Sequence, residues 1–391
     1  MADQLGDSRR IVIIGGGVIG VCAAYYLTRH PHYDRSKYRI TILEATKIAG
    51  GASGKAGGFI ASWADPPCLA SLTWGLHTDL AKEYDGVTNY GYREVRRLHC
   101  DVNLQGEPEK GEAERAQNKT VTPIPDWVYS NRIETCELKG DGAQLHPFQF
   151  TTVIANEAKA SGVEIIFGSA TSINYSEDGT AVESVNYRLK DSTDVQQLSA
   201  NYVIVAAGPW TPTVLPKVPI TGARNCAIHL RAPSKEISSD LVFFNNEVPN
   251  SWFPRIKLYP RPDDTIHISA GTDHLTQLPA STDLVVADKE ICEHLRRAAD
   301  FISPCLQGRE LLVEQACYRP ALTIPGRDRT HGPLLAPTPI SGLILATGHD
   351  NWGIQNAPAT GKIVSELVFD GKVVSADISS LTMGIDLRDI V

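Results

Sequence analysis

The sequence has no apolar run near the roughly 20 residues that a membrane-spanning helix requires. Its eight cysteines form no C-x-x-C pair, so neither a zinc site nor a disulfide framework is expected, and no metal ligands are predicted. Basic residues are not in excess, because 37 Lys and Arg stand against 45 Asp and Glu, for a net charge of −8. This balance argues against nucleic acid or an anionic membrane as the main partner. Residues 1–10 are polar and lack the apolar core of a signal peptide, which predicts a cytoplasmic protein.

What remains is an ordinary globular composition. Hydrophobic residues make up 42% and charged residues 21% of the 391 residues, as in soluble folded proteins. A chain of this length exceeds what one hydrophobic core usually organises, so two domains, or two interleaved ones, are expected.

The clearest local pattern lies near the N-terminus. Residues 11–14 form a short apolar run suited to a buried strand, residues 18–27 continue as an apolar helix, and residues 38–43 supply a second strand. Between the first strand and the helix, the spacing G-x-G-x-x-G is formed by Gly15, Gly17 and Gly20. Strand, glycine turn, helix and second strand in this order predict a dinucleotide-binding βαβ unit.

The chemistry of this unit depends on its glycines and on one acid. Gly15 permits the tight turn, Gly17 leaves room for a pyrophosphate against the backbone, and Gly20 lets the helix approach the strand closely. The helix N-terminus offers N–H groups to the pyrophosphate. Glu44, which ends the second strand, can accept hydrogen bonds from a ribose diol. The unit alone allows NAD and FAD equally.

Later segments return to the same kind of sheet. Residues 202–206 and 342–347 are again apolar strands that close on glycine turns. Between them, residues 216–317 favour an antiparallel sheet, with short strands expected over residues 241–244, 256–259 and 265–271. Helices are expected over residues 69–84, 148–161, 285–302 and 362–367. Residues 103–126 are polar and spotted with Pro and Gly, which predicts a surface loop.

The parallel sheet is therefore visited three times, with two excursions between the visits. This predicts an α/β chain in which a Rossmann-like domain is interleaved with a second, antiparallel-sheet domain. We expect the first domain to comprise residues 1–85, 145–215 and 318–391. The second, which would bind the substrate, would comprise residues 86–144 and 216–317.

Motifs in a fixed order along nearly the whole chain carry a resemblance to a known family. They are GGGVIG with Glu44, GGASGKAGG, HPFQFTTVIANEAKASGVEI, VIVAAGPW, YPRPDDTIHISAG, CYRP and ATGHDNWGIQNAPATG. With them the sequence resembles the flavoprotein family of D-amino acid oxidase, glycine oxidase and monomeric sarcosine oxidase, in particular its fungal members. The resemblance implies FAD as cofactor and a glutathione-reductase-type FAD domain interleaved with an α+β substrate domain.

The resemblance also implies which positions contact FAD. They are Gly15, Gly17, Val18, Ile19, Gly20, Glu44, Ala45, Gly51, Ala52, Ser53, Gly54, Ala56, Gly57, Gly58, Thr171, Ala207, Gly208, Trp210, Gly348, His349, Trp352, Gly353, Ile354 and Gln355. Cys317 stands where sarcosine-oxidase-like members carry a flavin-linked cysteine. Covalent attachment of FAD through Cys317 and a merely buried cysteine are both open.

Three residues are candidates for the reaction itself. In glycine-oxidase-like members the arginine of the R-P pair binds the substrate carboxylate, which gives this role to Arg319, with a structural arginine as the alternative. A guanidinium suits it because it is planar, permanently charged and bidentate. Tyr259 is expected to assist the carboxylate or to pack in the pocket wall. Lys257 is a candidate for polarising oxygen, with a solvated strand lysine as the alternative. Asn351 stands where such members can place a basic residue, which weakens the case for a second carboxylate-binding cation there.

The implied activity is oxidation of a small amine or amino acid, of EC 1.4/1.5 type. Hydride passes from the substrate to flavin N5, an imine leaves, and O2 reoxidises the flavin to give H2O2. Two alternatives stay open. One is a flavin dehydrogenase that acts on a non-amine substrate. The other is an FAD-stabilised protein that binds partners with little turnover, with residues 103–126 as its docking element.

Overall fold

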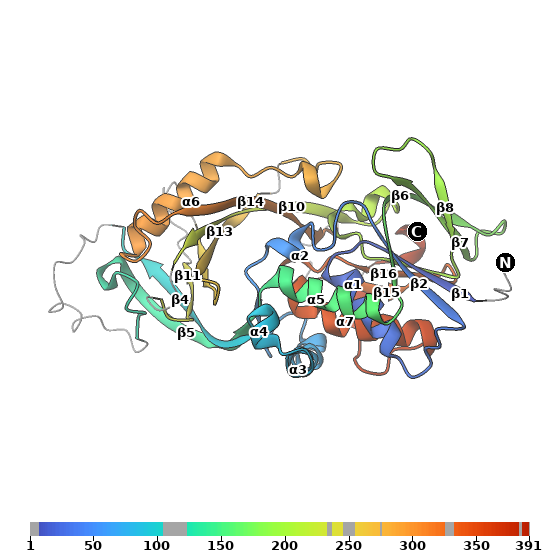
Figure 1. Cartoon of the computed structure of the whole chain (residues 1–391), viewed down its shortest axis with the longest axis horizontal. Coiled ribbons are helices and arrows are strands. Elements are labelled where there is room, and N and C mark those ends of the chain that lie inside the picture. The colour runs from blue at the N-terminus through green and yellow to red at the C-terminus, as the bar shows by residue number, and fades with distance from the viewer. Residues whose placement is uncertain are drawn as a thin grey trace.

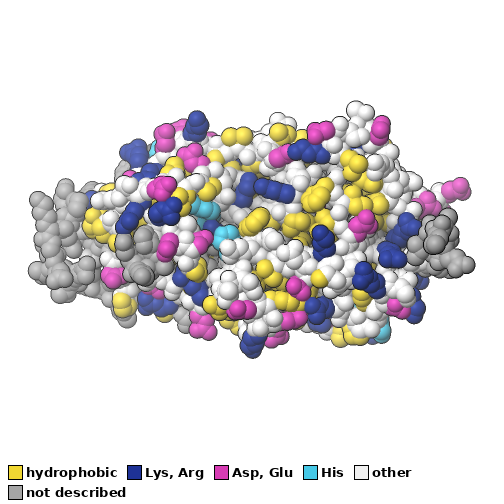
Figure 2. All heavy atoms as spheres, viewed as in Figure 1, with side chains coloured by type: hydrophobic (Ala, Val, Ile, Leu, Met, Phe, Trp, Pro, Cys, Tyr) yellow, Lys and Arg dark blue, Asp and Glu magenta, His cyan; other side chains and the backbone are white. Residues whose placement is uncertain are grey.

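Two eight-stranded sheets form the body of the protein, one toward each end of the elongated molecule (Figure 1). The computed structural model describes residues 8–104, 123–232, 237–244, 255–273, 276–324, 332–382 and 385–390. Most of the loop expected over residues 103–126 lies outside these ranges. None of the described helices is long and apolar enough to cross a membrane. On the face shown in Figure 2, basic and acidic side chains are interspersed.

The first sheet has the strand order β15-β16-β9-β1-β2-β6-β7-β8. Its parallel part comprises β1 (Arg9–Ile14), β2 (Tyr38–Glu44), β6 (Glu164–Tyr175), β9 (Tyr202–Val205) and β16 (Leu343–Thr347). Its antiparallel edges are β15 (Leu334–Pro337), β7 (Val182–Leu189) and β8 (Gln196–Ser199). The predicted return of the chain to one parallel sheet is therefore confirmed.

Strand β1 is buried on both faces, as its apolar sequence predicts. Ile11 and Ile13 are fully covered and join the core under the helices, whereas Val12 and Ile14 join the core on the opposite face. This division follows from the two-residue period of a strand. The helices on the first face are α1 (Val18–Arg29), α5 (Pro147–Ala160), α7 (Gly353–Phe369) and α3 (Pro67–Glu83) (Figure 1).

Helix α7 starts nine residues before the expected segment 362–367, although Pro358 lies inside it. Proline removes the N–H that would bond to the carbonyl four residues earlier, which is that of Ile354. His77 of α3 supplies the missing partner, since its Nε2 lies 3.0 Å from the Ile354 oxygen. Burial lowers the pKa of His77 to about 4, so the imidazole is neutral and donates one hydrogen bond. The helix therefore continues through the proline.

The second sheet has the order β14-β10-β13-β12-β11-β4-β5-β3. Its strands are β3 (Phe59–Ile60), β4 (Arg93–Val102), β5 (Ile133–Gln144), β10 (Ile220–Arg231), β11 (Leu241–Phe244), β12 (Lys257–Pro260), β13 (Thr265–Asp273) and β14 (Leu311–Leu322). Every pairing but β4–β11 is antiparallel. Short helices are α2 (Ala52–Lys55), α4 (Gly86–Tyr90) and α8 (Leu387–Ile390). The expected boundary between residues 317 and 318 falls inside β14, which belongs throughout to the second sheet.

Helix α6 (Lys289–Ile302) covers the outer face of the second sheet (Figure 1). It begins four residues after the expected start at residue 285, because Asp288 caps it. The Asp288 carboxylate accepts the N–H groups of Glu290 and Ile291 at 3.1 and 3.2 Å. Leu295 and Ile302 of the helix pack on the sheet core, which includes Leu258 and Ile268. The opposite face of this sheet therefore remains for the site.

Candidate active site

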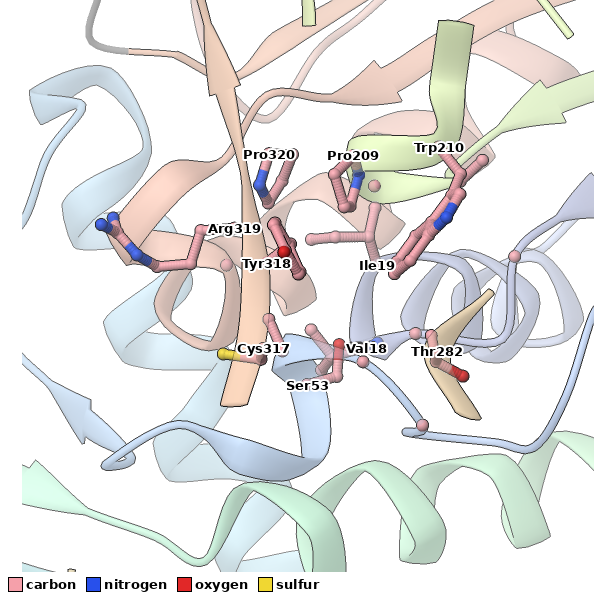
Figure 3. Close-up of a pocket in the computed structure, with 18 of the residues that line it drawn as sticks. Val18, Ile19, Ser53, Pro209, Trp210, Thr282, Cys317, Tyr318, Arg319 and Pro320 are labelled. Carbon is pink, nitrogen blue, oxygen red and sulfur yellow. Dashed lines mark hydrogen bonds between the residues drawn. The ribbon is translucent and has the colours of Figure 1, made fainter. Parts of the chain in front are cut away.

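A cavity of about 350 Å³ lies between the two sheets. Its first wall includes the carboxyl ends of β1, β2, β9 and β16, where ligands of parallel sheets usually bind. Its second wall is formed by β10, β12, β13 and β14. Figure 3 shows Val18, Ile19 and Ser53 of the first wall facing the β14 segment that carries Cys317 and Tyr318.

The glycine turn of the first wall admits no side chain at its key positions. Gly15 has φ 112°, and a Cβ there would lie 2.4 Å from the Ala206 carbonyl oxygen. A Cβ on Gly20 would lie 2.0 Å from the carbonyl oxygen of Gly15, so helix α1 could not approach β1. Helix α1 has no side-chain cap and no acidic residue in its first turn. The N–H of Val18, its first residue, donates to the hydroxyl of Ser53 at 2.8 Å. The helix dipole and the following N–H groups can act on an anion in the cavity.

Glu44 is held at the end of β2 by backbone donors. Its Oε2 accepts the N–H of Gly16 at 2.7 Å, and its Oε1 accepts the N–H of Thr46 at 2.9 Å. The hydroxyl of Thr46 lies 2.5 Å from that of Thr282, which comes from the second excursion. Oε1 of Glu44 also accepts from the Thr46 hydroxyl and the Lys47 N–H, at 3.1 and 3.3 Å. Glu44 lines the cavity, and its Oε2, with Gly16 as its one donor among the described residues, can accept from a hydroxyl group of a ligand.

The second wall owes its polarity to strand alternation. Leu258 and Ile268 point to the core under α6, whereas the alternate residues Lys257 and Ser269, which are paired across β12 and β13, line the cavity. The same alternation directs Cys317 and Arg319 of β14 to one side of their strand and Tyr318 to the other (Figure 3). One sheet thus has an apolar face and a face rich in ionisable groups.

Arg319 lies in the cavity wall and is already engaged. Its Nη1 donates to Asp350, which follows β16, and its Nη2 donates to the hydroxyl of Thr272. Its Nε is buried without a hydrogen-bond partner. Asp350 has φ 42°, a left-handed conformation that costs a non-glycine residue energy. The arginine therefore keeps further N–H donors for a second carboxylate.

Lys257 and Tyr259 line the cavity beside Arg319. Burial, then the charges of Arg319 and Arg97, lower the pKa of Lys257 to about 8. Burial raises the pKa of Tyr259, which keeps the phenol protonated. A Cβ on Gly57 would lie 2.4 Å from the Tyr259 ring, so this glycine allows the loop after α2 to pack against the tyrosine.

Two neighbouring histidines belong to the second wall of the cavity. His267 lines the cavity, and its Nδ1 lies 3.0 Å from Nε2 of His229. Gln315 contacts the same Nε2 of His229 at 3.2 Å. Burial, and then the charge of Arg261, lower the pKa of both imidazoles, so the pair is neutral near pH 7.

Cys317 is buried in the cavity wall next to Lys55. The Lys55 ammonium donates to the carbonyl of Ala316 at 2.8 Å. Burial raises the pKa of the Cys317 thiol to about 11, although Arg319 and Lys55 act in the opposite direction. The thiol is therefore protonated near pH 7, and its attachment to a flavin stays a prediction.

Most of the expected site residues come together around this cavity. Those that line it are Gly15, Gly17, Val18, Ile19, Glu44, Ala45, Gly51, Ala52, Ser53, Ala56, Gly57, Ala207, Gly208, Trp210, Lys257, Tyr259, Cys317, Arg319, His349, Gly353 and Ile354. Those that do not line it are Gly20, Gly54, Gly58, Thr171, Gly348, Trp352 and Gln355.

The residues outside the cavity have structural tasks. Gln355 exchanges two hydrogen bonds with the backbone of Ala61, at 2.8 and 2.9 Å, so its amide is fully occupied. The hydroxyl of Thr171 donates to the carbonyl of Asn186 at 3.2 Å. Gly58 has φ 88°, and a Cβ there would lie 1.8 Å from the Leu145 carbonyl oxygen.

Sequence reasoning missed several residues that line the cavity. They are Lys55, Asn225, His267, Ser269, Thr282 and Asp350. The alternation of polar and apolar residues in β13 was a usable signal for His267 and Ser269, because one face of this buried strand is apolar and the other is polar. Nothing local pointed to Thr282 or Asp350.

The described residues contain one cluster of metal-ligand type, formed by His30, His32 and Asp370. Each histidine lies 3.2 Å from an oxygen of Asp370, and the cluster joins the ends of α1 and α7. Ion pairing accounts for the cluster, and we assign no metal to it.

The sequence matches the family DAO, FAD dependent oxidoreductase, over residues 10–367. The chain belongs to this family. It is 31% identical to protein C1F5.03c of Schizosaccharomyces pombe, over 96% of this chain and 98% of that protein. It is 29% identical to protein TDA3 of Saccharomyces cerevisiae, over 95% and 94% of the two chains. The structure resembles glycine oxidase from Geobacillus kaustophilus with a TM-score of 0.71 and 19% identity, covering 97% of this chain and 100% of that one.

The protein is thus an FAD-dependent oxidoreductase of the DAO family. Its cavity fits that cofactor. The N-terminus of α1, which carries no acidic residue in its first turn, suits a pyrophosphate, and Glu44 suits a ribose. Small residues that line the cavity, including Gly51, Ala52 and Gly208, leave space between themselves and the second wall.

Proposed function

We propose that the protein oxidises a small amine or amino acid to an imine, with O2 as the electron acceptor and H2O2 as the second product. The observation that carries the proposal is Arg319, a guanidinium that lines the cavity from β14, in the wall across from the one that contains the glycine turn suited to FAD. Glycine oxidase, a structural neighbour, is named for an amino-acid substrate. Bound FAD would supply the acceptor for the substrate's C–H hydride.

The side chains of the second wall would bind and orient the substrate. Arg319 would hold a carboxylate with its remaining N–H donors, a geometry in which guanidinium is better than ammonium. Tyr259 would donate its protonated hydroxyl or pack beside the carboxylate. The cations Lys257 and Arg319 disfavour a third positive charge nearby, which lowers the pKa of the substrate ammonium and favours the neutral amine.

We also propose that the cavity-lining members of the set expected to contact FAD do contact it. Residues 1–85, 145–215 and 318–391 would act as the FAD domain, except for residues 318–322, which complete β14 of the second sheet. Residues 86–144 and 216–317 would form the substrate domain. A cytoplasmic location is part of the same proposal.

Attachment of FAD through Cys317 is tested by acid precipitation. Yellow colour that stays with the wild-type pellet and leaves the Cys317→Ser pellet supports a thioether, and colour in the wild-type supernatant ends that idea.

The activity is tested by an anaerobic substrate screen on the yellow protein. Glycine, sarcosine, D-amino acids and N-methyl amino acids are added in turn, and we expect at least one of these classes to bleach the flavin. Admission of air should restore the colour and yield H2O2. Bleaching by non-amine substrates alone favours the flavin dehydrogenase. No bleaching, together with partner binding that is lost on deletion of residues 103–126, favours the partner-binding protein.

A further inference from the structure

The cavity side of the second sheet carries more positive charge than it balances with its own carboxylates. Lys257 of β12 and Arg319 of β14 line the cavity there, and Arg97 of β4, which does not line it, is close enough for its charge to act on that of Lys257. Within the described residues these three cations make a single ion pair, between Arg319 and Asp350. Two cations are therefore left without an anionic partner among the described side chains.

Lys257 is open to a ligand. Its side chain is exposed to solvent and lines the cavity. No hydrogen bond or ion pair joins its Nζ to any other described residue, and the Nζ lies 5.5 Å from the centre of the Phe243 ring. An ammonium in such a place is more stable with an anion beside it.

Arg97 lies near the same ring. Its guanidinium carbon lies 5.8 Å from the centre of Phe243 and 4.2 Å from the centre of Trp63. Its Nε is buried and has no hydrogen-bond partner. Phe59 adds a third ring at 5.6 Å. These contacts hold the guanidinium in place through ring faces and leave N–H donors unused.

Together these side chains form what we name the Phe243 subsite, comprising Lys257, Arg97, Phe243, Phe59 and Trp63. Of the five only Lys257 lines the cavity, so the other four extend the site beyond it. Phe59 and Phe243 pack edge to face at 6.4 Å, and Phe59 and Trp63 lie 5.9 Å apart. Aromatic rings suit a carbon chain, and the two cations suit an acid group at the end of that chain. Molecular oxygen is neutral and needs neither a second cation nor an apolar wall of this size.

We propose that the substrate carries a second acidic group, which Lys257 and Arg97 bind in the Phe243 subsite while Arg319 binds the first. The substrate class is then an amino dicarboxylic acid or an N-substituted derivative of one. This assignment rests on the proposed function, because it extends the same site.

The test measures binding to the FAD-loaded protein without turnover. Glutarate and succinate are compared with butyrate as unreactive ligands, and each dissociation constant is read from the change in the visible flavin spectrum. We expect the better dicarboxylate to bind roughly tenfold or more tightly than butyrate, since a charge-assisted contact to a partly buried cation is worth about that factor. Equal affinity for mono- and dicarboxylates overturns the proposal.

Matched variants locate the effect. Lys257→Met should reduce the dicarboxylate preference at least fivefold, in proportion to the lost contact, and Lys257→Arg should retain most of it. Lys289→Met removes the same charge from exposed α6, outside the cavity, and should leave the preference unchanged. A Lys257→Met protein that keeps its FAD and the full preference contradicts the assignment.

The pH dependence gives a second readout. Arg319 on β14, Arg97 on β4, Asp350 after β16 and Arg255 on the lysine's own segment act on its charge, and burial with these neighbours lowers the pKa of Lys257 to about 8. The lysine is charged below that pH and loses its charge above it. Dicarboxylate affinity should therefore fall as pH rises through about 8 in the wild type and should show no such step in Lys257→Met.

The outcomes distinguish the subsite proposal from a role of Lys257 in the reaction with oxygen and from the proposed function. If Lys257→Met slows only reoxidation by air while the dicarboxylate preference stays, the lysine serves oxygen and the subsite is refuted. If amines bleach the flavin but no ligand shows a dicarboxylate preference, the proposed function stands and the subsite fails. If no amine bleaches the flavin but the preference depends on Lys257, the subsite stands and the proposed function fails.

Discussion

The two walls of the cavity recognise ligands by different means. The first wall uses backbone, namely the N-terminus of α1, the bare turn at Gly15 and a carboxylate fixed by N–H groups at Glu44. The second wall uses side chains that alternate along antiparallel strands, such as Lys257 and Arg319. A binding site built from backbone groups tolerates almost no substitution of its glycines and keeps the same cofactor. A binding site built from side chains can change its ligand through single substitutions.

The largest effect is expected from Gly20→Ala in the first wall. The added Cβ would lie 2.0 Å from the carbonyl oxygen of Gly15, so α1 must move away from β1 and lose its place at the pyrophosphate. We expect a protein that is purified without FAD or is not soluble. Flavin absorbance per protein and thermal unfolding measure this.

Gly75→Ala is the matched control. Gly75 lies in α3, and a Cβ there would meet no atom within 4 Å. FAD content should be unchanged, and the stability should rise by about 0.5–1 kcal/mol because alanine is the better helix former. Equal loss of FAD in both variants would show that FAD binding does not depend on the close approach of α1 to β1 at Gly20.

In the second wall, Arg319→Met should lower kcat/KM by roughly 10²–10³-fold, as expected when one partner of a charged contact of about 3–4 kcal/mol is removed. It also leaves the Asp350 carboxylate without its arginine. Arg319→Lys keeps the charge but not the planar fork, so it should recover only part of the loss. Steady-state kinetics on the FAD-loaded proteins measure kcat/KM for each variant. An unchanged kcat/KM in Arg319→Met would contradict substrate binding by this residue.

A smaller effect is expected from Glu44→Gln. The amide can still accept from Gly16, but it loses the charge that strengthens those hydrogen bonds and any from a ribose. FAD affinity should fall about tenfold, or about 1.4 kcal/mol. Titration of the apoprotein with FAD measures it, and unchanged affinity would remove Glu44 from the cofactor site.

The smallest effect on FAD and ligand binding is expected from Asp288→Ala, on the outer side of the second sheet. The change removes the cap of α6 and a contact with Arg224 at 3.1 Å. Stability should fall by about 1–2 kcal/mol, the range for a lost helix cap. FAD content and ligand affinity should not change, because α6 faces away from the cavity. Chemical denaturation and flavin titration check the two halves of this prediction, and a loss of FAD would link the outer face to the site.

The comparison of the walls also explains what the sequence could predict. Strand, turn and helix of the first wall were predictable because Gly15 and Gly20 are required by short-range geometry. Helix α7 starts nine residues before the segment expected from the sequence and runs through Pro358, which by local rules breaks a helix. The side chain that satisfies the freed carbonyl, His77, lies 277 residues away in sequence from Ile354.

The polar residues of the second wall were harder to predict for the same reason. Arg319 was identified through an R-P motif, but its partner Asp350 comes from the end of another strand, 31 residues later. Thr282 reaches Thr46 across 236 residues of sequence. Such pairs exist only once the two sheets have met, so no local pattern indicates them.

The central claim is that FAD against the first wall accepts electrons from an amine held by the second. The most direct test is single-turnover anaerobic mixing of the FAD-loaded protein with the most effective amine of the screen. We predict that flavin bleaching matches the loss of amine one for one and is strongly slowed in Arg319→Met. A flavin that stays yellow with every amine, or a bleaching rate that is indifferent to Arg319, would contradict the account.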